Sequence, residues 1–425
     1  MLRLLGYLHT LALYPAARTV VTAQSLRMWL KTLGQRPRVH HETAYDGRPI
    51  LLLALYEKGG LRPDVTRLLR AARGQGLYVL AVNTLRLTDP AATRDLIDCY
   101  IERPNFGRDF GSYKTGFLHL FARGWQGTCP RLLMLNDSIY FSQERMPAFL
   151  RDMMAPEAEV LGGTENFEIE YHLGSFCIAM AGRILAHPQF RAYWRGYRLT
   201  DVRPVVIRRG EMGLSKALKR CVADPRGFAA LYGAARYLRA LQQDDSLIDV
   251  TLTRARTSDL TGWKRVSPEN IRTALQGRFL APVNTLSKQV EKHDIQLDAR
   301  LEELNRRMFV KDRETLLGYL RKNLDDGAQA DEAILMEAIR SELGHAFLEG
   351  SQIHQNAAIL LHMGMPLVKL DGLYRGMFNL FDIRNITAAL TVDEQQELTA
   401  LLVERPYGND TLTGWRRAAF NRGLI

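Results

Sequence analysis

The stretch that decides the fold is Arg131-Leu-Leu-Met-Leu-Asn136-Asp137-Ser138-Ile-Tyr-Phe141, in which an apolar run ends at a polar triplet. A short apolar run of this kind predicts a strand that is buried on both faces of a parallel sheet. Such a strand brings Asn136, Asp137 and Ser138 to its carboxyl end, where open α/β sheets bind nucleotides and related ligands. The triplet therefore predicts a ligand site at this edge of a sheet.

Strand and helix patterns alternate on the amino-terminal side of this stretch. Pro49–Tyr56 and Gly76–Asn83 predict two buried strands, Asp64–Gln75 predicts a helix between them, and Ala92–Cys99 predicts a short helix. Further elements are expected around residues 146–153, 160–165, 171–180 and 190–197. Because strands and helices alternate, we expect an α/β fold, a Rossmann-type mostly parallel sheet flanked by helices.

The same reading predicts four segments along the chain. They are an N-terminal helical segment (1–47), an α/β nucleotide-binding domain (48–220), a helical insertion (221–345) and a C-terminal helical segment that completes the domain (346–425). Within the insertion, one helical stripe is formed by Leu297, Leu301, Leu304 and Met308. Charges around His293 interrupt any long heptad pattern, so this stripe favours packing against the sheet domain over a coiled coil.

The composition is that of a globular protein. The 425 residues are 46% hydrophobic and 24% charged, which argues against a disordered or fibrous chain. The net charge of +11 favours an anionic partner. The four cysteines stand singly, without a metal-binding or disulfide spacing, and indicate a reducing cytoplasm.

The apolar start of the chain does not have the pattern of a secretory signal. The run from Leu4 to Ala17 is interrupted by His9, and only Arg3 precedes it. No later window approaches the roughly 18 apolar residues of a bilayer span. We therefore expect a cytoplasmic protein that contacts a membrane, if at all, peripherally from the inner face.

The block Asn105-Phe-Gly107-Arg108-Asp109-Phe-Gly111-Ser-Tyr-Lys114 combines two glycines with opposite charges before an expected helix. Free N–H groups at the helix start, with Arg108 or Lys114, suit a diphosphate, and Asp109 suits a ribose or sugar hydroxyl. The alternative is a capped turn with a surface Arg–Asp pair.

The triplet itself resembles a degenerate form of the Asp-x-Asp motif with which GT-A glycosyltransferases hold a divalent metal. Asp137, phosphate oxygens and water suit Mg²⁺ or Mn²⁺, but one carboxylate is fewer than usual, so metal dependence stays open. In the alternative reading, Asp137 only caps the following turn.

Two neighbouring segments carry candidates for acid–base chemistry. Glu165, which follows the Gly162-Gly163 turn, is the first choice as a general base, and His172 is the second. A histidine at a strand edge also serves as a structural hydrogen-bonding residue.

Two further segments carry cations. Arg208–Arg220 surrounds Glu211 with basic residues that suit a diphosphate or simply form a solvated basic helix. Lys369, in the segment Met365–Gly376, suits a phosphate or a surface pair with Asp371.

In their order along the chain, these blocks resemble the rhamnan synthesis protein F family of bacterial polysaccharide-assembly proteins. The matching pieces are the strands ending at Tyr56 and Asn83, the Asn105–Lys114 block, Leu135–Ser138, His172–Phe176, Glu211–Ser215 and Pro366–Lys369. The resemblance implies a GT-A-like glycosyltransferase. It would move rhamnose or a related deoxyhexose from a nucleoside-diphosphate donor to a cell-surface polysaccharide or lipid-linked acceptor, with inversion.

The resemblance also implies roles for the candidate residues. Tyr56 and Asn83 are expected near the base, Arg108 and Asp109 near ribose and diphosphate, and Asp137 at the sugar phosphate. Additional donor contacts are expected from Asn105, Gly107, Lys114, Asn136, Ser138, Glu211 and Lys369. The alternative function is a non-catalytic glycan- or nucleotide-binding subunit of a polysaccharide-assembly complex. Nucleic acid is not an expected partner, because only the net charge favours it and no reader motif is present.

Overall fold

The computed structural model describes residues 2–254, 271–272, 275, 312–323, 331–378, 380–405 and 407–425. The chain divides into two compact units. Unit 1 comprises Met1–Leu231, Gly364–Gly376 and Leu390–Ile425, and unit 2 comprises Tyr232–Met363 and Met377–Ala389. The predicted stripe from Leu297 to Met308 lies outside the described residues.

Unit 1 is built on an eight-stranded, mostly parallel sheet with the order β1-β4-β3-β2-β5-β10-β7-β11. Its strands are β1 Arg38–Glu42, β2 Ile50–Leu55, β3 Tyr78–Asn83, β4 Cys99–Glu102, β5 Arg131–Asn136, β7 Val160–Gly162, β10 Cys177–Ala181 and β11 Phe228–Ala230. β1 and β10 run antiparallel to the other six. The predicted Rossmann-like α/β sheet is therefore present, and its crossovers reverse direction between β2 and β5.

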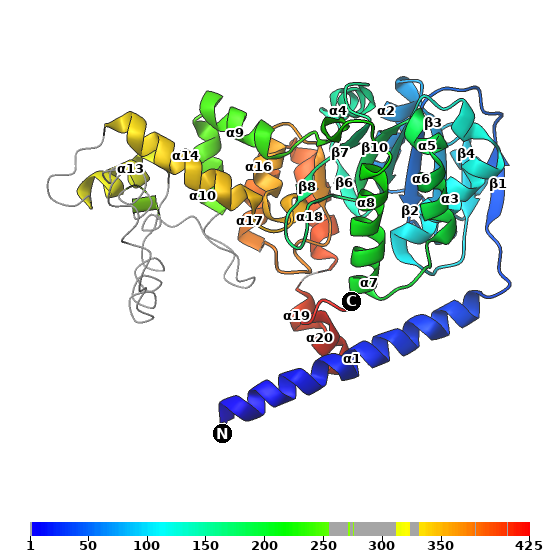
Figure 1. The fold of residues 1–425 in the computed structure, drawn as a ribbon, viewed down its shortest axis with the longest axis horizontal. Coiled ribbons are helices and arrows are strands. Elements are labelled where there is room, and N and C mark those ends of the chain that lie inside the picture. Colours follow the sequence, from blue (N-terminus) through cyan, green and yellow to red (C-terminus); the bar gives the residue numbers. More distant parts are fainter. Residues whose placement is uncertain are drawn as a thin grey trace. The chain divides into compact units, whose positions relative to one another are not determined.

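The central strands are buried because helices cover both faces of the sheet. Every residue of β2, β3 and β5 is buried. One face is covered by α3 (Arg108–Ala122), α5 (Gly182–Ala186), α6 (Pro188–Gly196) and α8 (Gly213–Lys219), and the other by α2 (Pro63–Gly74) and α4 (Met146–Met154) (Figure 1). The apolar runs of these strands are thus the pattern of a doubly covered parallel sheet.

Aromatic packing fixes α3 against α6. The indole of Trp194 is fully buried and stacks on Phe117, with ring centroids 4.6 Å apart. Phe190 meets the same indole edge-on at 6.3 Å. Because α3 begins with the predicted Arg108–Asp109 pair, this packing also positions the start of that helix.

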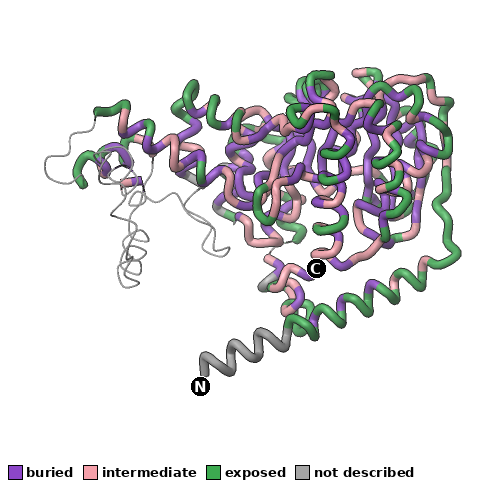
Figure 2. The backbone as a smooth tube through the Cα atoms, viewed as in Figure 1, coloured by how far each residue is buried: buried purple, intermediate pink, exposed green. Residues whose placement is uncertain are grey.

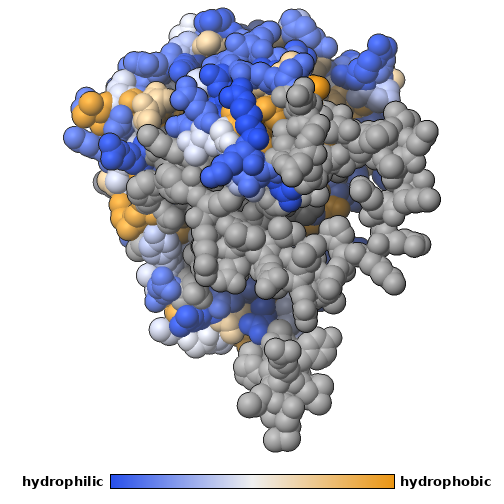
Figure 3. Space-filling model, turned by 90° about the vertical axis from the view of Figure 1, so that its left-hand side faces the viewer, coloured by the Kyte–Doolittle hydropathy of each residue, from blue (hydrophilic) through white to orange (hydrophobic). Residues whose placement is uncertain are grey.

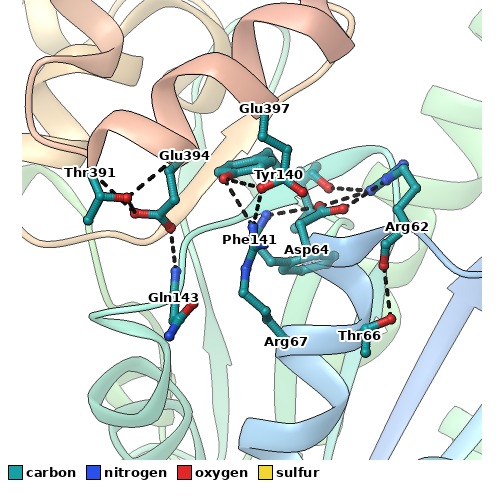
Figure 4. Close-up of polar contacts among 11 residues, drawn as sticks. Arg62, Asp64, Thr66, Arg67, Tyr140, Phe141, Gln143, Thr391, Glu394 and Glu397 are labelled. Atoms are coloured by element: carbon teal, nitrogen blue, oxygen red, sulfur yellow. Dashed lines mark hydrogen bonds and ion pairs between the residues drawn. The ribbon is translucent and has the colours of Figure 1, made fainter.

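The end of the chain returns to the strand that follows the polar triplet. β12 (Leu367–Lys369) pairs with β6 (Ile139–Phe141) in a separate two-stranded sheet. From α18 (Val392–Val403), Glu397 accepts hydrogen bonds from Arg67 and from the Tyr140 hydroxyl, and Glu394 accepts one from the Gln143 N–H at 2.7 Å (Figure 4). These contacts hold β6, and with it the triplet, in place.

Several local expectations were wrong. Residues 38–42, predicted within a helical segment, form β1, although α1 (Leu2–Thr32) is helical as predicted. The expected helix Ala92–Cys99 is replaced by a 3₁₀ turn at Pro90–Thr93 and by β4, because pairing with β3 and β1 overrides local helix preference.

The expected strand 171–180 is broken into β9 (His172–Leu173) and β10. The two pieces flank Gly174, where an added Cβ would lie 2.5 Å from the Phe176 ring. The compact unit that contains the sheet also extends beyond 48–220, since β1 and β11 belong to it, and the predicted segment 346–425 is divided between the two units.

The described part of unit 2 is helical. Its longest described helix is α14 (Glu332–Leu348), and Phe347 of this helix stacks on Tyr237 of α9 (Ala234–Gln243) with centroids 4.1 Å apart. In the view of Figure 3 the described surface is mostly hydrophilic, with small separate hydrophobic areas. Within the described residues, no helix is both long and apolar enough to span a bilayer.

Replacement of Trp194 by alanine should destabilise unit 1 strongly. Removal of a fully buried indole leaves a cavity and typically costs about 3–5 kcal/mol of unfolding free energy. The matched control is Trp415→Ala, because the side chain of Trp415 is 38% exposed. Urea unfolding followed by circular dichroism measures both, and equal losses in the two variants would contradict the packing described for α3 and α6.

Candidate functional site

The site lies where the carboxyl ends of β2 and β5 meet, at the reversal of crossover direction. The two strands run parallel and in register from Ile50 and Leu132 to Ala54 and Asn136. Ligands of open α/β sheets bind in the crevice outside such a reversal. The polar triplet follows β5 directly, so the structure places it at the expected edge.

Four predicted residues form one hydrogen-bonded chain, here named the polar row. The Asn136 amide donates to Asp109 at 2.9 Å, the Ser138 hydroxyl donates to Asn136 at 2.6 Å, and the Lys369 ammonium donates to Ser138 at 2.5 Å. The row thus joins the start of α3, the end of β5 and β12. Burial raises the pKa of Asp109, and the nearby cations Lys369 and Arg108 oppose that shift.

The loop before α3 is shaped by a residue that sequence reasoning missed, Arg103. Its buried guanidinium donates to the Ser112 hydroxyl and to the backbone carbonyls of Pro104, Phe106 and Arg108. Burial lowers the pKa of Arg103 to about 10. The sequence does contain a signal for Arg103: it is an arginine that directly follows a strand and precedes a Gly-rich loop.

Backbone conformations in this loop are unusual because the turn into α3 is tight. Gly107 has a φ of 92° and Arg108 a φ of 50°, in the left-handed region that costs a non-glycine residue energy. Hydrogen bonds from the Gly107 N–H to Asp201 (2.7 Å) and from the Arg108 side chain to the Asp201 carbonyl (3.0 Å) hold the turn.

Three guanidinium groups gather next to the polar row, and we name Arg108, Arg203 and Arg375 the arginine cluster. They come from the start of α3, the start of α7 (Arg203–Val206) and the turn after β12. Burial, followed by repulsion from Arg375, lowers the pKa of both Arg108 and Arg203, to about 10 for Arg203. Sequence reasoning had picked only Arg108.

The members of the cluster differ in what compensates their charge. Arg375 is paired with Asp371, and Arg108 bonds to the Asp201 backbone. Within the described residues, Arg203 has no hydrogen bond or ion pair. Repelling cations with one uncommitted guanidinium make a favourable site for a multiply charged anion.

Asp137 is turned inward, away from the role of a simple metal ligand. Its carboxylate accepts from the Tyr56 backbone N–H, and its side chain shares a hydrogen bond with Glu57. Burial raises the pKa of Asp137 to about 8, and the charge of Glu57 adds to the shift. The two buried carboxyl groups therefore share a proton near neutral pH.

These contacts do not fit a divalent cation at Asp137. One carboxylate oxygen is committed to a backbone N–H, and the backbone carbonyl of Asp137 accepts from Arg62 at 2.9 Å. A different group of three potential ligands, Glu42, Cys99 and His119, lies elsewhere in the described residues, but Glu42 is paired with Arg123 at 3.0 Å.

The other predicted donor-binding residues are not all brought to the row. Asn83 is fully buried, and its amide bonds to the Glu57 backbone and the Tyr100 hydroxyl, so it holds the strand ends together. Lys114 donates to the carbonyls of Arg195 and Tyr197 at the end of α6. Tyr56 is 50% exposed at the end of β2, and Asn105 is exposed in the loop before α3.

The acid–base candidates fall into two groups. Glu165, in β8 (Glu165–Asn166), accepts a hydrogen bond from Tyr171. The Nδ1–H of His172 donates to the Glu170 carbonyl at 2.7 Å, and its Nε2 lies 3.8 Å from Glu211. Burial opposes protonation of His172, but the interactions with Glu211 and the Glu170 carbonyl raise its pKa overall.

The electrostatic influence of Glu211 extends to the polar row and the arginine cluster. It raises the pKa of Asp109 and opposes the lowering of the pKa of Arg203. The side chain of Glu211 is 31% exposed, whereas that of His172 is only 4% exposed. Of these two residues, Glu211 is therefore the one that a substrate can reach.

Comparisons with known proteins give distant relatives. The chain is 23% identical over 338 residues to the uncharacterized protein y4gN of Sinorhizobium fredii, which covers 72% of this chain and 86% of that protein. It is 29% identical over 135 residues to the virulence protein VirA of Vibrio anguillarum, which covers 30% of this chain and 43% of that protein. No family model matches the chain. Neither name specifies a reaction.

Asp137→Asn should change how stability depends on pH. The carboxyl group has a folded-state pKa of about 8, above its unfolded value, so the folded state binds the extra proton. Wild-type stability should then fall as pH rises from about 4 to 8, by up to about 1.4 kcal/mol per pH unit. Asparagine imitates the protonated acid, so the variant should lose most of this slope. Urea unfolding at several pH values measures it, and parallel slopes would contradict the shared proton.

Proposed function

We propose that the chain is a glycosyltransferase that uses a nucleoside-diphosphate sugar. The observation that carries this proposal is the arginine cluster beside the polar row, at the reversal point of an α/β sheet. A diphosphate would add negative charge among the three mutually repelling guanidinium groups. Sugar hydroxyls supply partners for the carboxylate and amide of the row.

The donor can be assigned to these groups by chemistry. Arg203, Arg375 and Lys369 bind the diphosphate, because their charges complement it. Asp109 and Asn136 bind hydroxyl groups of the sugar or ribose. The half-exposed ring of Tyr56 stacks on the base at the end of β2. These assignments keep Tyr56, Asp109, Asn136 and Lys369 from the predicted donor set and add Arg203 and Arg375 to it.

Transfer then requires one base and a stabilised leaving group. An acceptor hydroxyl attacks the anomeric carbon, the bond from that carbon to the diphosphate oxygen breaks, and Glu211 takes the hydroxyl proton. The electron pair leaves on the nucleoside diphosphate, whose charge the arginine cluster and Lys369 stabilise. Direct attack from the face opposite the leaving group inverts the anomeric centre. His172 is a positioning residue for Glu211.

The finer identity of the enzyme follows from the resemblance stated above. We propose a GT-A-like domain. Strand β10 runs antiparallel between β5 and β7, so the sheet differs from an all-parallel doubly wound sheet. We propose rhamnose or a related deoxyhexose as the sugar and a cell-surface polysaccharide or lipid-linked glycan as the acceptor.

The deciding experiment is a calorimetric titration with a panel of nucleoside-diphosphate sugars, in EDTA and in Mg²⁺ or Mn²⁺, followed by transfer assays with the donor that binds. Selective binding with transfer supports the proposal, and we expect both to persist in EDTA. Binding without transfer or hydrolysis across plausible acceptors would favour the non-catalytic subunit. No binding to any donor would overturn the transferase proposal and would favour a glycan-binding subunit.

Arg203→Ala should weaken donor binding by roughly 10- to 100-fold, because a charge-assisted contact to the diphosphate is lost. Arg208→Ala is the matched control, since Arg208 is an exposed arginine five positions further along. Calorimetry with the selected donor measures both dissociation constants. Equal affinity in the wild type and in Arg203→Ala would remove the arginine cluster from the donor site.

Glu211→Gln should lower kcat by roughly 10²- to 10⁴-fold, the usual contribution of a general base. Donor affinity should change little, because the base acts on the acceptor hydroxyl. Glu165→Gln is the matched comparison and should retain most of the rate. A large loss in Glu165→Gln, with Glu211→Gln active, would instead assign the base to Glu165.

A further inference from the structure

Helix α1 carries two different apolar faces. On one, Ala17 and Val21 are buried in a cluster with Val202, Ala419 and Leu424 of unit 1. Ser25, one turn further along, reaches the Thr200 hydroxyl at 3.3 Å. These residues recur every four positions, so they form one stripe that attaches α1 to its unit.

The other face is open. Leu26, Trp29 and Leu30 follow a spacing of three and four positions, which places them on one side of the helix, and Leu33 lies in the turn directly after the helix. Their exposed fractions are 54%, 44%, 53% and 54%. At about 100° per residue, this stripe lies on a different side from Ala17 and Val21. Figure 2 shows the described part of α1 as mostly exposed.

The charges around the open stripe have a single sign. Arg27, Lys31 and Arg36 are exposed beside it, and the first 41 residues contain six basic residues and no Asp or Glu. The surroundings of the stripe therefore complement an anionic surface.

We propose that the outer face of α1, formed by Leu26, Trp29 and Leu30 together with Leu33 in the turn that follows, binds the interface of a membrane that contains anionic lipids. Leucine and tryptophan side chains enter the boundary between headgroups and acyl chains, and the flanking cations meet lipid phosphates. A second copy of the same face is a poor occupant, because it would bring like charges together without a carboxylate to pair them.

Binding to a bilayer goes beyond the proposed transferase activity and does not depend on it. A helix that lies in the interface would hold the sheet edge of unit 1 near lipid-linked substrates without crossing the membrane. The two proposals can therefore fail separately, and the test below measures both vesicle binding and nucleotide-sugar binding.

The test is cosedimentation of the full chain with vesicles of phosphatidylcholine alone or with 30% phosphatidylglycerol. We expect salt-sensitive binding to the anionic vesicles. A Trp29→Glu, Leu30→Glu double variant should bind roughly 10-fold more weakly or worse, and Lys31→Gln roughly fivefold more weakly. The control is Val392→Glu, which changes a 68% exposed apolar residue of α18 and should bind normally.

A second measurement reports where the helix lies. Brominated lipids should quench part of the tryptophan fluorescence of the wild type, and Trp29→Phe should remove that part while it still binds vesicles. Circular dichroism and donor titration confirm that each variant is folded. Failure of the wild type to bind anionic vesicles, or unchanged binding of the double variant, would overturn the proposal. So would a dimer in light scattering that the double variant abolishes, because a second copy would then cover this face.

Discussion

The hydrogen bond from the Tyr56 backbone N–H to the Asp137 carboxyl group is the contact on which the site depends. β2 and β5 end side by side at the reversal of the sheet, where their terminal backbone groups have no further ladder partners. Asp137 satisfies one of these groups with its side chain, and its own backbone N–H donates to the Ala54 carbonyl at 3.0 Å. Asn136 and Ser138, on either side of it, are thereby fixed at the edge.

The burial that makes this contact strong also decides the charge of the site. Asp137 and Glu57 are each only 5% exposed, so two negative charges there would be poorly solvated. One proton and the guanidinium of Arg62 reduce the repulsion. Asp109 and several cations occupy the exposed side of the edge. The folded state also contains three mutually repelling arginines. Charge that is uncompensated within the protein is typical of a site whose ligand completes the balance.

Sequence patterns could predict the centre of the fold because burial on both faces leaves a clear signal. The runs that became β2, β3 and β5 are apolar throughout, and their carboxyl ends carry the polar residues of the edge. β1 and β4 could not be found in this way, because β1 alternates exposed and buried residues only weakly and β4 depends on its neighbours. Glu57 was missed for a similar reason: it is an acidic residue one position beyond an expected strand.

The residues of the candidate site likewise divide into those that local sequence motifs predict and those that only the fold brings together. Asp109, Asn136, Ser138 and Lys369 were found from local motifs, but one of the hydrogen bonds that join them, from Lys369 to Ser138, links positions 231 residues apart. Arg203 and Arg375 stand in segments without a distinctive motif, and only the fold brings them to Arg108. Lys114 and Asn83 have side chains that suit a donor, but these side chains donate to backbone carbonyls at the end of α6 and just beyond the end of β2.

For the proposed sugar transfer, the inward turn of Asp137 determines how a leaving diphosphate would be stabilised. A site that relies on a divalent cation needs carboxylate oxygens that face the phosphate and remain charged at neutral pH. Here the carboxylate is committed to the strand ends, whereas the mutually repelling cations Arg108, Arg203 and Arg375 come from α3, α7 and the turn after β12. Fixed guanidinium groups perform the same electrostatic task without a metal, since they neutralise the charge that develops on the phosphate oxygens. Asp137 thus holds backbone groups at the strand ends, and Arg203 and Arg375 provide the positive charge, so the two features belong together.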